Sequence, residues 1–523
     1  MPSPDLLRQF GLARNPFVDR TAEKTLLDGS SLYVHSDLAR FQPSETTYVI
    51  FGRRGSGKTT IRLQMQHAYD EYNDRVRATG KSRGHFMVDL CRPGHLTACL
   101  RNFQEATGCS DENWESQFGE LWTSADMVDC ILAYTASALV DKMTDPRNQE
   151  GREMLEAVKA DARASKQLLL LSHLYAKTDA ASLAYLRREL LRPHYTAVEV
   201  GAGVAVAATA VGGAVAASRN AEVADALSSP FRNAWQDVER SAPVVARHPR
   251  LFFGALAAVT AVGVSYLWRN KTARGLDRAQ ELSRHVRVAK QQPPIVMAAL
   301  LNHLFSAQDR VSTIRSLCIG ISAHQKLEHL SSLVTLLGHE SLAVFGDCFD
   351  EVVLLDPVSY PGAIKAFAKE VCRNDLLNFG RLHFFFPDSR LSLDLNTDKT
   401  LKTARFDRHL VRDLTWSRHQ LEDLARRRLE GASLVASEHQ GTITGEHMGN
   451  TGDAREPPAS PFDALFGKVN VEDYSSYLAK LSTPRELMIM MTEIFARVEA
   501  NPEKNLEAQD MEIAVTKALE QAV

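Results

Sequence analysis

The stretch that decides the fold is YVIFGRRGSGKTTIRLQM, residues 48–65. Its first four residues are apolar or aromatic and follow two threonines, which predicts a strand over residues 46–51. A glycine-rich turn comes next, and the residues after it have the composition and spacing of a helix start. This order of strand, turn and helix predicts an α/β fold with a place for phosphates at the turn.

The turn satisfies the Walker A pattern G-x-x-x-x-G-K-[ST] as GRRGSGKT, residues 52–59. Glycines let the backbone bend so that successive N–H groups converge on phosphate oxygens. Lys58 is expected to reach the β- and γ-phosphates as a point charge, and the Thr59 hydroxyl to join a magnesium shell. An arbitrary glycine-rich turn is the alternative interpretation, and Arg53 and Arg54 also fit solvated loop positions. The residues expected to bind the nucleotide are Gly52, Arg53, Arg54, Gly55, Ser56, Gly57, Lys58, Thr59 and Thr60.

Such a cradle also needs an acid at the end of a neighbouring buried strand to hold magnesium. The segment SLAVFGDCFDE, residues 341–351, fits this role with Asp347 at the tip of an apolar run. A stricter ATPase pattern places a second carboxylate directly after the metal acid, to orient the attacking water, but Cys348 stands there. Glu351 or Asp350 is the candidate substitute. A strand ending in solvated acids is the alternative, and binding is better supported than hydrolysis.

Composition excludes several other classes of protein. The 523 residues predict two to four domains, and a net charge of -3 without a long basic stripe argues against a nucleic-acid partner. The N-terminus lacks a continuous apolar segment, which argues against a secretory signal peptide. The cysteines are scattered singly, which argues against a disulfide framework or structural zinc site and indicates reducing surroundings. They lie at positions 91, 99, 109, 130, 318, 348 and 372.

Further elements are predicted from apolar periodicity. Strands are expected in residues 84–90 and 380–388, in addition to those already described. Helices are expected in residues 124–143, 164–191, 324–338, 416–431 (with Gly431 as the stop) and 482–498. The four methionine and isoleucine residues 488–491 are interpreted as core of the last helix.

Two stretches have the composition of membrane spans, residues 200–218 and 251–268. They contain 19 and 18 residues without a charge, close to the minimum for a hydrocarbon core of roughly 30 Å. The second ends in Trp268 and is bracketed by arginines, which suits a membrane interface. The first is rich in alanine and glycine, with a small-residue stripe suited to close helix packing in lipid. A buried alanine-rich hairpin in a soluble domain is the alternative interpretation.

The order of the segments supports a pair of spans. If residues 46–194 and 273–431 belong to one core, the chain between them must return to the side that it left, which two spans achieve. Arginines and lysines near the outer ends of the pair favour a cytoplasmic location for those ends. The predicted blocks are a lead-in (1–45), the first part of the core (46–194), the transmembrane hairpin (195–272), the second part of the core (273–431), a flexible linker (432–460) and a small helical domain (461–523).

The Walker A turn, the FGDCFDE strand end, the FFFPDSR strand and the late STPREL helix together resemble the STAND and AAA-like branch of P-loop NTPases. The inserted apolar pair is similar to that of the KAP NTPases. The resemblance implies an αβα core and a C-terminal all-α lid whose Arg485 senses the γ-phosphate. It also implies a polar residue near 388–390 and a preference for ATP over GTP.

The function predicted is that of a membrane-anchored, ATP-binding P-loop NTPase that works as a signalling or scaffold switch. It is expected to bind ATP with Mg²⁺, to act as an ATPase, and to face the cytoplasm from an integral membrane anchor. Expected partners are the lipid bilayer and either a homo-oligomer or another protein, without nucleic acid. Two alternatives stay open: a catalytically weak or inactive ATP-binding membrane scaffold, and a membrane-remodelling NTPase.

Overall fold

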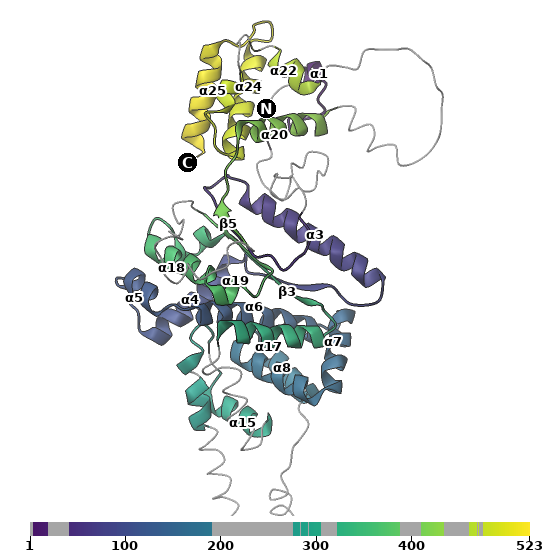
Figure 1. Ribbon diagram of the computed structural model, residues 1–523, viewed down its shortest axis with the longest axis vertical. Helices are drawn as coiled ribbons and strands as arrows, with labels where there is room; N and C mark the ends of the chain where they lie inside the picture. Colours follow the sequence, from purple (N-terminus) through teal and green to yellow (C-terminus); the bar gives the residue numbers. More distant parts are fainter. Residues whose placement is uncertain are drawn as a thin grey trace, which may run out of the picture. The chain divides into compact units, whose positions relative to one another are not determined.

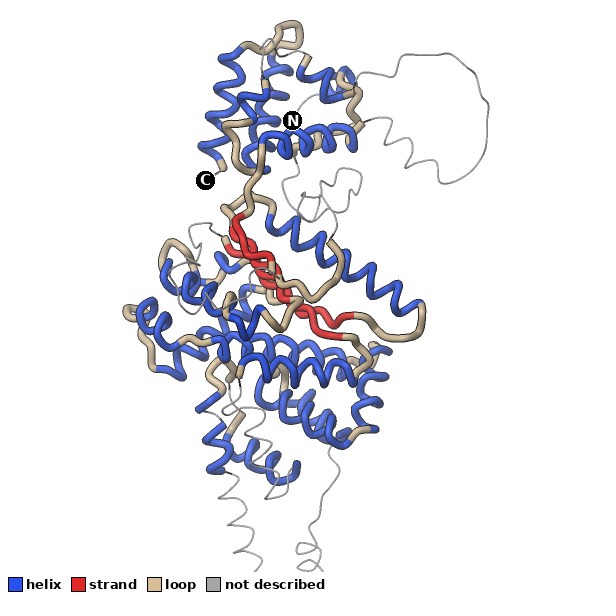
Figure 2. Tube along the Cα trace, in the orientation of Figure 1, coloured by secondary structure: helices blue, strands red, loops and turns tan. Residues whose placement is uncertain are grey.

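Five parallel strands form one sheet in the order β2-β3-β4-β1-β5. Figure 2 shows the strands in red, between helices in blue. The computed structural model describes residues 4–18, 41–190, 276–304 apart from 283 and 291, 322–387, 409–433, and 460–522 apart from 468 and 470–473. The strands are β1 (Tyr48–Phe51), β2 (His85–Asp89), β3 (Ser341–Gly346), β4 (Leu382–Phe386) and β5 (Leu410–Asp413). The predicted α/β class and the first four strands are confirmed, whereas β5 had no sequence signal.

The chain divides into two compact units, one of residues 1–135 with 322–523 and one of residues 136–321. The first unit holds the sheet, α3 (Lys58–Ala78), α4 (Pro93–Thr107), α5 (Trp114–Leu121), α17 (Ala323–Leu336), α18 (Pro361–Val371) and α19 (Asn374–Leu377). Helix α6 (Ser124–Thr144) begins in this unit and ends in the other. The predicted helices at 124–143 and 324–338 are therefore confirmed.

Both faces of the sheet are covered, which explains why the inner strands β1, β3 and β4 are mainly apolar runs (Figure 1). On one face, Ile50, Phe345 and Phe385 pack with residues of α3. On the other face, Phe386 stacks on Phe51 with ring centroids 5.3 Å apart, and Phe349 lies 5.0 Å from the same ring. Successive residues of each strand therefore point to opposite faces of the sheet. Because all the strand pairings are parallel, the carboxyl ends of the strands meet at one edge.

The order of the strands places the turn after β1 at a particular edge. Helix α3 leaves the carboxyl end of β1 on one face of the sheet, and the chain then crosses to β2 at the far side. The segment after β3 instead continues through η3 (Phe349–Glu351) and η4 (Val353–Leu355) into α18 on the other face. Connections that diverge in this way mark the carboxyl edge where α/β folds bind ligands.

The second unit is helical where the structure describes it. Its helices include α7 (Gln149–Ala160), α8 (Ala162–Tyr175), α9 (Ala180–Leu190) and α15 (Pro294–Leu304). Asp161 caps α8 by accepting from the N–H groups of Arg163 and Ala164. The helical segment predicted at 164–191 is two helices, separated by residues 176–179.

The two predicted membrane spans, at 200–218 and 251–268, lie outside the described residues. Among the residues that the structure does describe, no helix combines the length and apolar character needed to cross a bilayer. Most of the predicted linker, residues 434–459, and the positions 388–390 also lie outside them.

The C-terminal helices have an apolar core of their own. They are α20 (Arg418–Gly431), α22 (Pro461–Phe466), α23 (Ser475–Leu478), α24 (Pro484–Ala500) and α25 (Ala508–Gln521). Met490 and Met491 are fully buried in this core, which confirms the interpretation of the methionine-rich segment. Gly431 is the last residue of α20, so the cap is Ala432, one position later than predicted.

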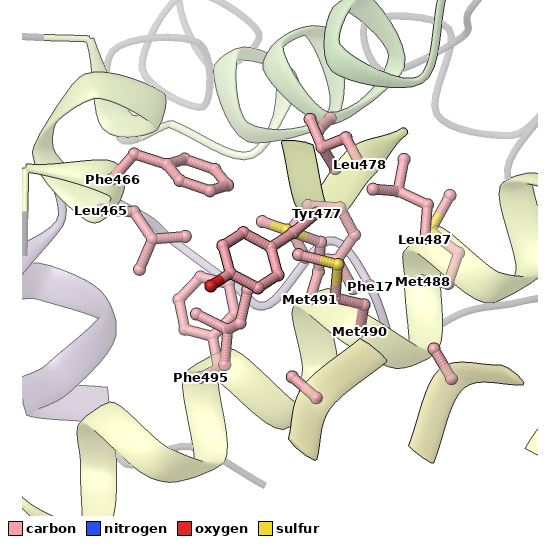
Figure 3. Packing of buried hydrophobic residues seen from close by; sticks show 14 of the residues in the cluster. Phe17, Leu465, Phe466, Tyr477, Leu478, Leu487, Met488, Met490, Met491 and Phe495 are labelled. Carbon is pink, nitrogen blue, oxygen red and sulfur yellow. The ribbon is translucent and has the colours of Figure 1, made fainter. Parts of the chain in front are cut away.

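The N-terminal residues pack into the same core, which we call the helical domain (residues 4–18, 418–433 and 460–522). The first of these residues form the short helix α1 (Pro4–Gln9). Phe17 is fully buried and its ring lies 6.1 Å from that of Phe495 (Figure 3). Leu12 forms an isolated antiparallel bridge with Ser433, and Arg428 donates to the Pro16 carbonyl at 2.9 Å. Residues near the start of the chain thus belong structurally with residues more than 400 positions later.

Candidate functional site

The glycine-rich turn joins the carboxyl end of β1 to the first residue of α3. Gly55 and Gly57 have φ angles of 82° and 91°, which side chains with a Cβ rarely adopt. Gly57 is the N-cap of α3, and no side chain caps this helix. The first N–H groups of a long helix therefore face the turn without a side-chain acceptor, an arrangement suited to an anion.

Lys58 curls back over the turn from the first position of α3. Its Nζ donates to the carbonyl oxygens of Gly52 and Arg53, at 2.7 and 3.0 Å. These contacts hold the ammonium group above the same backbone whose N–H groups a phosphate would need. Lys58, which the sequence predicts as a phosphate ligand, therefore lies with its ammonium group against the carbonyl oxygens of the turn.

Asp347 meets the turn although β4 lies between its strand and β1. From the sequence, the strand before Asp347 was expected to be the neighbour of β1. The side chains of Thr59 and Asp347 span the width of β4 instead. Thr59 Oγ1 donates to Asp347 Oδ2 at 2.9 Å, joining residues 288 positions apart. Asp347 is only 4% exposed, so this contact is well shielded from water.

Arg62 is a member of the site that the sequence did not indicate. Its Nε lies 3.2 Å from Asp347 Oδ2, and its Nη1 donates to Gln66 Oε1 at 2.8 Å. Burial lowers the pKa of Arg62, but facing groups, Cys91 and Asp347 foremost, raise it overall. A signal was available, because Arg62 lies three residues after Thr59 and so shares its face of the helix.

Cys348, which stands where a second acid was expected, has a left-handed backbone with a φ of 60°. Its N–H donates to Asp347 Oδ1 at 2.8 Å. Burial, followed by the nearby Asp347 and Glu351 carboxylates, raises the pKa of the Cys348 thiol to about 12. This neutral thiol cannot act as a base near neutral pH.

Asp350 and Glu351 lie exposed on η3, one turn beyond Asp347. Among the described residues, neither carboxylate forms a hydrogen bond or ion pair. The structure therefore brings Asp347, but neither of these two acids, into contact with Thr59.

The helical domain touches the turn through the start of α24 and the segment before α20. The N–H of Arg485 donates to the Gly55 carbonyl at 3.2 Å. The indole N–H of Trp416 donates to the Ser56 carbonyl at 2.8 Å, and Arg53 donates to Ser482 Oγ at 2.5 Å. A Cβ added at Gly55 would lie 2.5 Å from the Cβ of Arg485, so glycine is required for this approach.

The other predicted residues have simpler surroundings. Arg54 is exposed, and Thr60 is half-buried in the first turn of α3. Ser56 is buried, and its Oγ has no hydrogen-bond partner among the described residues. That orphaned hydroxyl lies close to Gly52, where an added Cβ would be 2.6 Å from it.

The described residues contain no group of three or more His, Cys, Asp or Glu side chains that could hold a metal ion on their own. His95, between Cys91 and Cys99 in the sequence, stacks on Tyr134 with centroids 3.9 Å apart.

Comparison of the chain with family models, curated proteins and solved structures gave no match. Function is therefore inferred from the geometry of this edge of the sheet.

Proposed function

We propose that this chain is a membrane-anchored P-loop NTPase that binds ATP with magnesium and works as an ATP-dependent switch. The observation that supports it most is the convergence of the glycine-rich turn, Lys58 and Thr59 with Asp347 at one carboxyl edge. These groups come from positions 288 residues apart and are the types that phosphate and magnesium recognition need. The preference for ATP over GTP rests on the resemblance to the STAND and AAA-like branch.

The residues present fit a magnesium ion. The Thr59 hydroxyl donates a hydrogen bond to Asp347 and keeps its oxygen lone pairs for another partner. Asp347 already accepts from three donors, so it suits a metal-bound water better than the metal itself. When bound, magnesium would supply positive charge to the β- and γ-phosphate oxygens.

The helical domain gives the switch a physical basis. Arg485 and Trp416 contact the carbonyls of Gly55 and Ser56, which belong to the turn that would surround the phosphates. A nucleotide that reshapes the turn would therefore change these contacts and shift the helical domain. Arg485 is proposed to reach the γ-phosphate from this position.

Nucleotide binding is tested by titrating purified protein with a fluorescent ATP analogue in the presence of magnesium. Lys58→Ala is expected to lower affinity at least roughly 100-fold, because the ammonium group is lost from the phosphates. Lys81→Ala, which removes an exposed lysine beyond the end of α3, is the matched control and should leave affinity unchanged. Equal affinities for the two variants would reject the phosphate-binding turn.

A second candidate, an ATP-binding scaffold without turnover, is favoured by the neutral thiol of Cys348 and by the Thr59 hydroxyl, whose carboxylate partner is Asp347 and not an acid of η3. ATP hydrolysis with and without liposomes separates the two. Hydrolysis lost on combining Asp350→Asn with Glu351→Gln supports the switch with these acids as water-positioning groups, and no hydrolysis by the unmodified chain supports the scaffold. Turnover stimulated by liposomes would instead favour membrane remodelling.

The anchor is tested independently. We expect the expressed chain to stay in the membrane pellet after alkaline carbonate extraction, through the apolar residues 200–218 and 251–268. Release into the supernatant would reject the membrane anchor while leaving the nucleotide proposal intact.

A further inference from the structure

The metal acid of the proposed nucleotide site already has a cation beside it. The Arg62 guanidinium contacts Asp347 Oδ2 through Nε at 3.2 Å, and both side chains are largely shielded, at 9% and 4% exposed. Gln66, one turn further along α3, accepts from Nη1 and fixes the guanidinium plane. The pair is therefore held by contacts on two sides rather than by a mobile surface arginine.

The same carboxylate oxygen has a second donor. Oδ2 accepts from Thr59 Oγ1 as well as from Arg62, while Oδ1 accepts from the Cys348 N–H. A carboxylate oxygen offers about two lone pairs, so Oδ2 is fully used. A cation that approached Oδ2 directly would have to displace Thr59 or share the oxygen with Arg62, whereas Oδ1 keeps one lone pair.

The negative charge of Asp347 also affects the proposed binding of a nucleotide. Without a nearby cation, the Asp347 carboxylate would repel the phosphates in the adjoining turn, and in a shielded site that repulsion is weakly screened. Arg62 neutralises this carboxylate from the protein side. The repulsion is then already offset before any metal binds.

We propose that Arg62 is a built-in counter-cation for Asp347, a positioning residue that holds the acid on Thr59 and makes nucleotide binding at this site only weakly dependent on magnesium. This inference rests on the proposed function and deepens it. It assigns to the site a ligand class that includes nucleoside triphosphate free of divalent metal. Because coupling between two ligands is reciprocal, bound nucleotide should also strengthen metal binding to the protein only slightly.

The test measures the affinity for a fluorescent ATP analogue with magnesium and with EDTA, and takes the ratio of the two Kd values. For the unmodified chain we expect the loss of affinity in EDTA to be below roughly tenfold. Arg62→Gln leaves Asp347 without its cation, so the loss should grow at least roughly tenfold further. Arg62→Lys restores a positive charge and should return the ratio toward that of the unmodified chain. Arg75→Gln, an exposed arginine on the same helix, is the matched control and should not change the ratio.

The ratio separates this role from a structural one, because a general loss of packing weakens both affinities alike. An unchanged ratio in Arg62→Gln would overturn the proposal. If that variant does not fold, the unmodified chain still tests the proposal. A loss of affinity for the ATP analogue above roughly 100-fold in EDTA overturns the proposal, and a loss below tenfold supports it. For losses between these values, titration with Mn²⁺ decides. The affinity of the protein for Mn²⁺ is measured with and without the ATP analogue, after correction for the Mn²⁺ that the analogue binds in solution. An increase of more than tenfold contradicts the proposal, and a smaller increase supports it. Absence of nucleotide binding under both conditions would mean that the proposed function itself has failed.

Discussion

At the scale of single residues, Cys348 shows how a local environment decides what a side chain can do. It follows Asp347, the proposed metal acid, directly, where a catalytic carboxylate would be expected, and it adopts a left-handed backbone. Its N–H is used to orient Asp347. The residue therefore helps to position the acid through its backbone, and its side chain contributes no charge.

The thiol of Cys348 is predicted to react slowly. Because burial and then the Asp347 and Glu351 carboxylates raise its pKa to about 12, very little thiolate is present at pH 7.5. Alkylation by iodoacetamide, followed by peptide mass spectrometry, should be at least roughly 100-fold slower at this cysteine in the folded chain than in urea. Comparable rates in both states would show that the thiol is not held in this environment.

The candidate site was predictable from sequence only in part. Lys58, Thr59 and Asp347 could be identified because the Walker A spacing and an acid after an apolar run have a direct chemical meaning. Arg62 carries no such pattern, since an arginine in a helix is usually a solvated residue. Its role depends on the register that brings α3 over the end of β3, which is a property of the fold.

At the scale of elements, the contact between the turn and α24 depends on glycine. Thr483 caps α24 by accepting from the Glu486 N–H at 3.2 Å, which fixes the helix start next to Gly55. Arg485, the second residue of the helix, then lies over Gly55. The sequence predicted α24 but not its contact with Gly55, because capping residues specify where a helix begins and carry no information about which residues its first turn contacts.

Gly55→Ala is predicted to disrupt this docking. The added Cβ meets the Arg485 Cβ at 2.5 Å, so backbone must shift, at a cost of about 1–3 kcal/mol beyond the strain of the left-handed residue. Gly80→Ala is the matched control, because Gly80 also has a positive φ, of 66°, but its Cβ would meet nothing within 4 Å. Unfolding free energies measured by urea titration should show the larger loss for Gly55→Ala. Equal losses would mean that the turn and α24 are not in contact.

The strands differ in how visible they are in the sequence. Four of them are runs of apolar residues bounded by turn or polar positions, and these were predicted. The fifth, β5, has four residues and ends in Arg412 and Asp413, because it pairs with β1 alone at the edge of the sheet. A half-exposed edge strand needs no apolar run, so composition does not reveal it.

At the scale of the whole molecule, residues from opposite ends of the chain share one core. Phe10, Leu12 and Phe17 lie in the predicted lead-in of residues 1–45, where Asn-Pro and the charged run after it favour an extended segment and a turn. Instead these three side chains are buried among the C-terminal helices. Three separated apolar residues have no period that distinguishes a packed segment from a loop.

Phe17→Ala is predicted to destabilise the helical domain. Phe17 is fully buried against Phe495, and loss of a buried phenylalanine side chain costs about 3–5 kcal/mol. The adjacent Val18 is 38% exposed, so Val18→Ala should cost about 0.5 kcal/mol or less. Urea unfolding followed by circular dichroism measures both variants, and a small effect of Phe17→Ala would place the N-terminal segment outside this core.

The stability of the sheet-containing unit is predicted to fall at mildly acidic pH because of a histidine in β4. His383 is fully buried next to the Tyr69 hydroxyl, at 3.0 Å. Burial, with a smaller contribution from Arg381, lowers the pKa of His383 to about 3, against about 6.5 for an unfolded chain. Between these values the unfolded state binds a proton that the folded state does not, so stability is retained above pH 6.5 and lost as the pH falls below it.

Between pH 7 and pH 5 this linkage amounts to about 2 kcal/mol, given about 1.4 kcal/mol per pH unit for one proton. The unfolding free energy is measured at both pH values. Its decrease from pH 7 to pH 5 should be larger in the unmodified chain than in His383→Asn by about this amount, because the asparagine side chain does not titrate there. His67→Asn, at an exposed position on α3, serves as the control and should keep the pH dependence of the unmodified chain. Because both variants remove one histidine, the comparison isolates burial in the sheet from a general change in charge, and identical pH dependences for the two variants would refute the assignment.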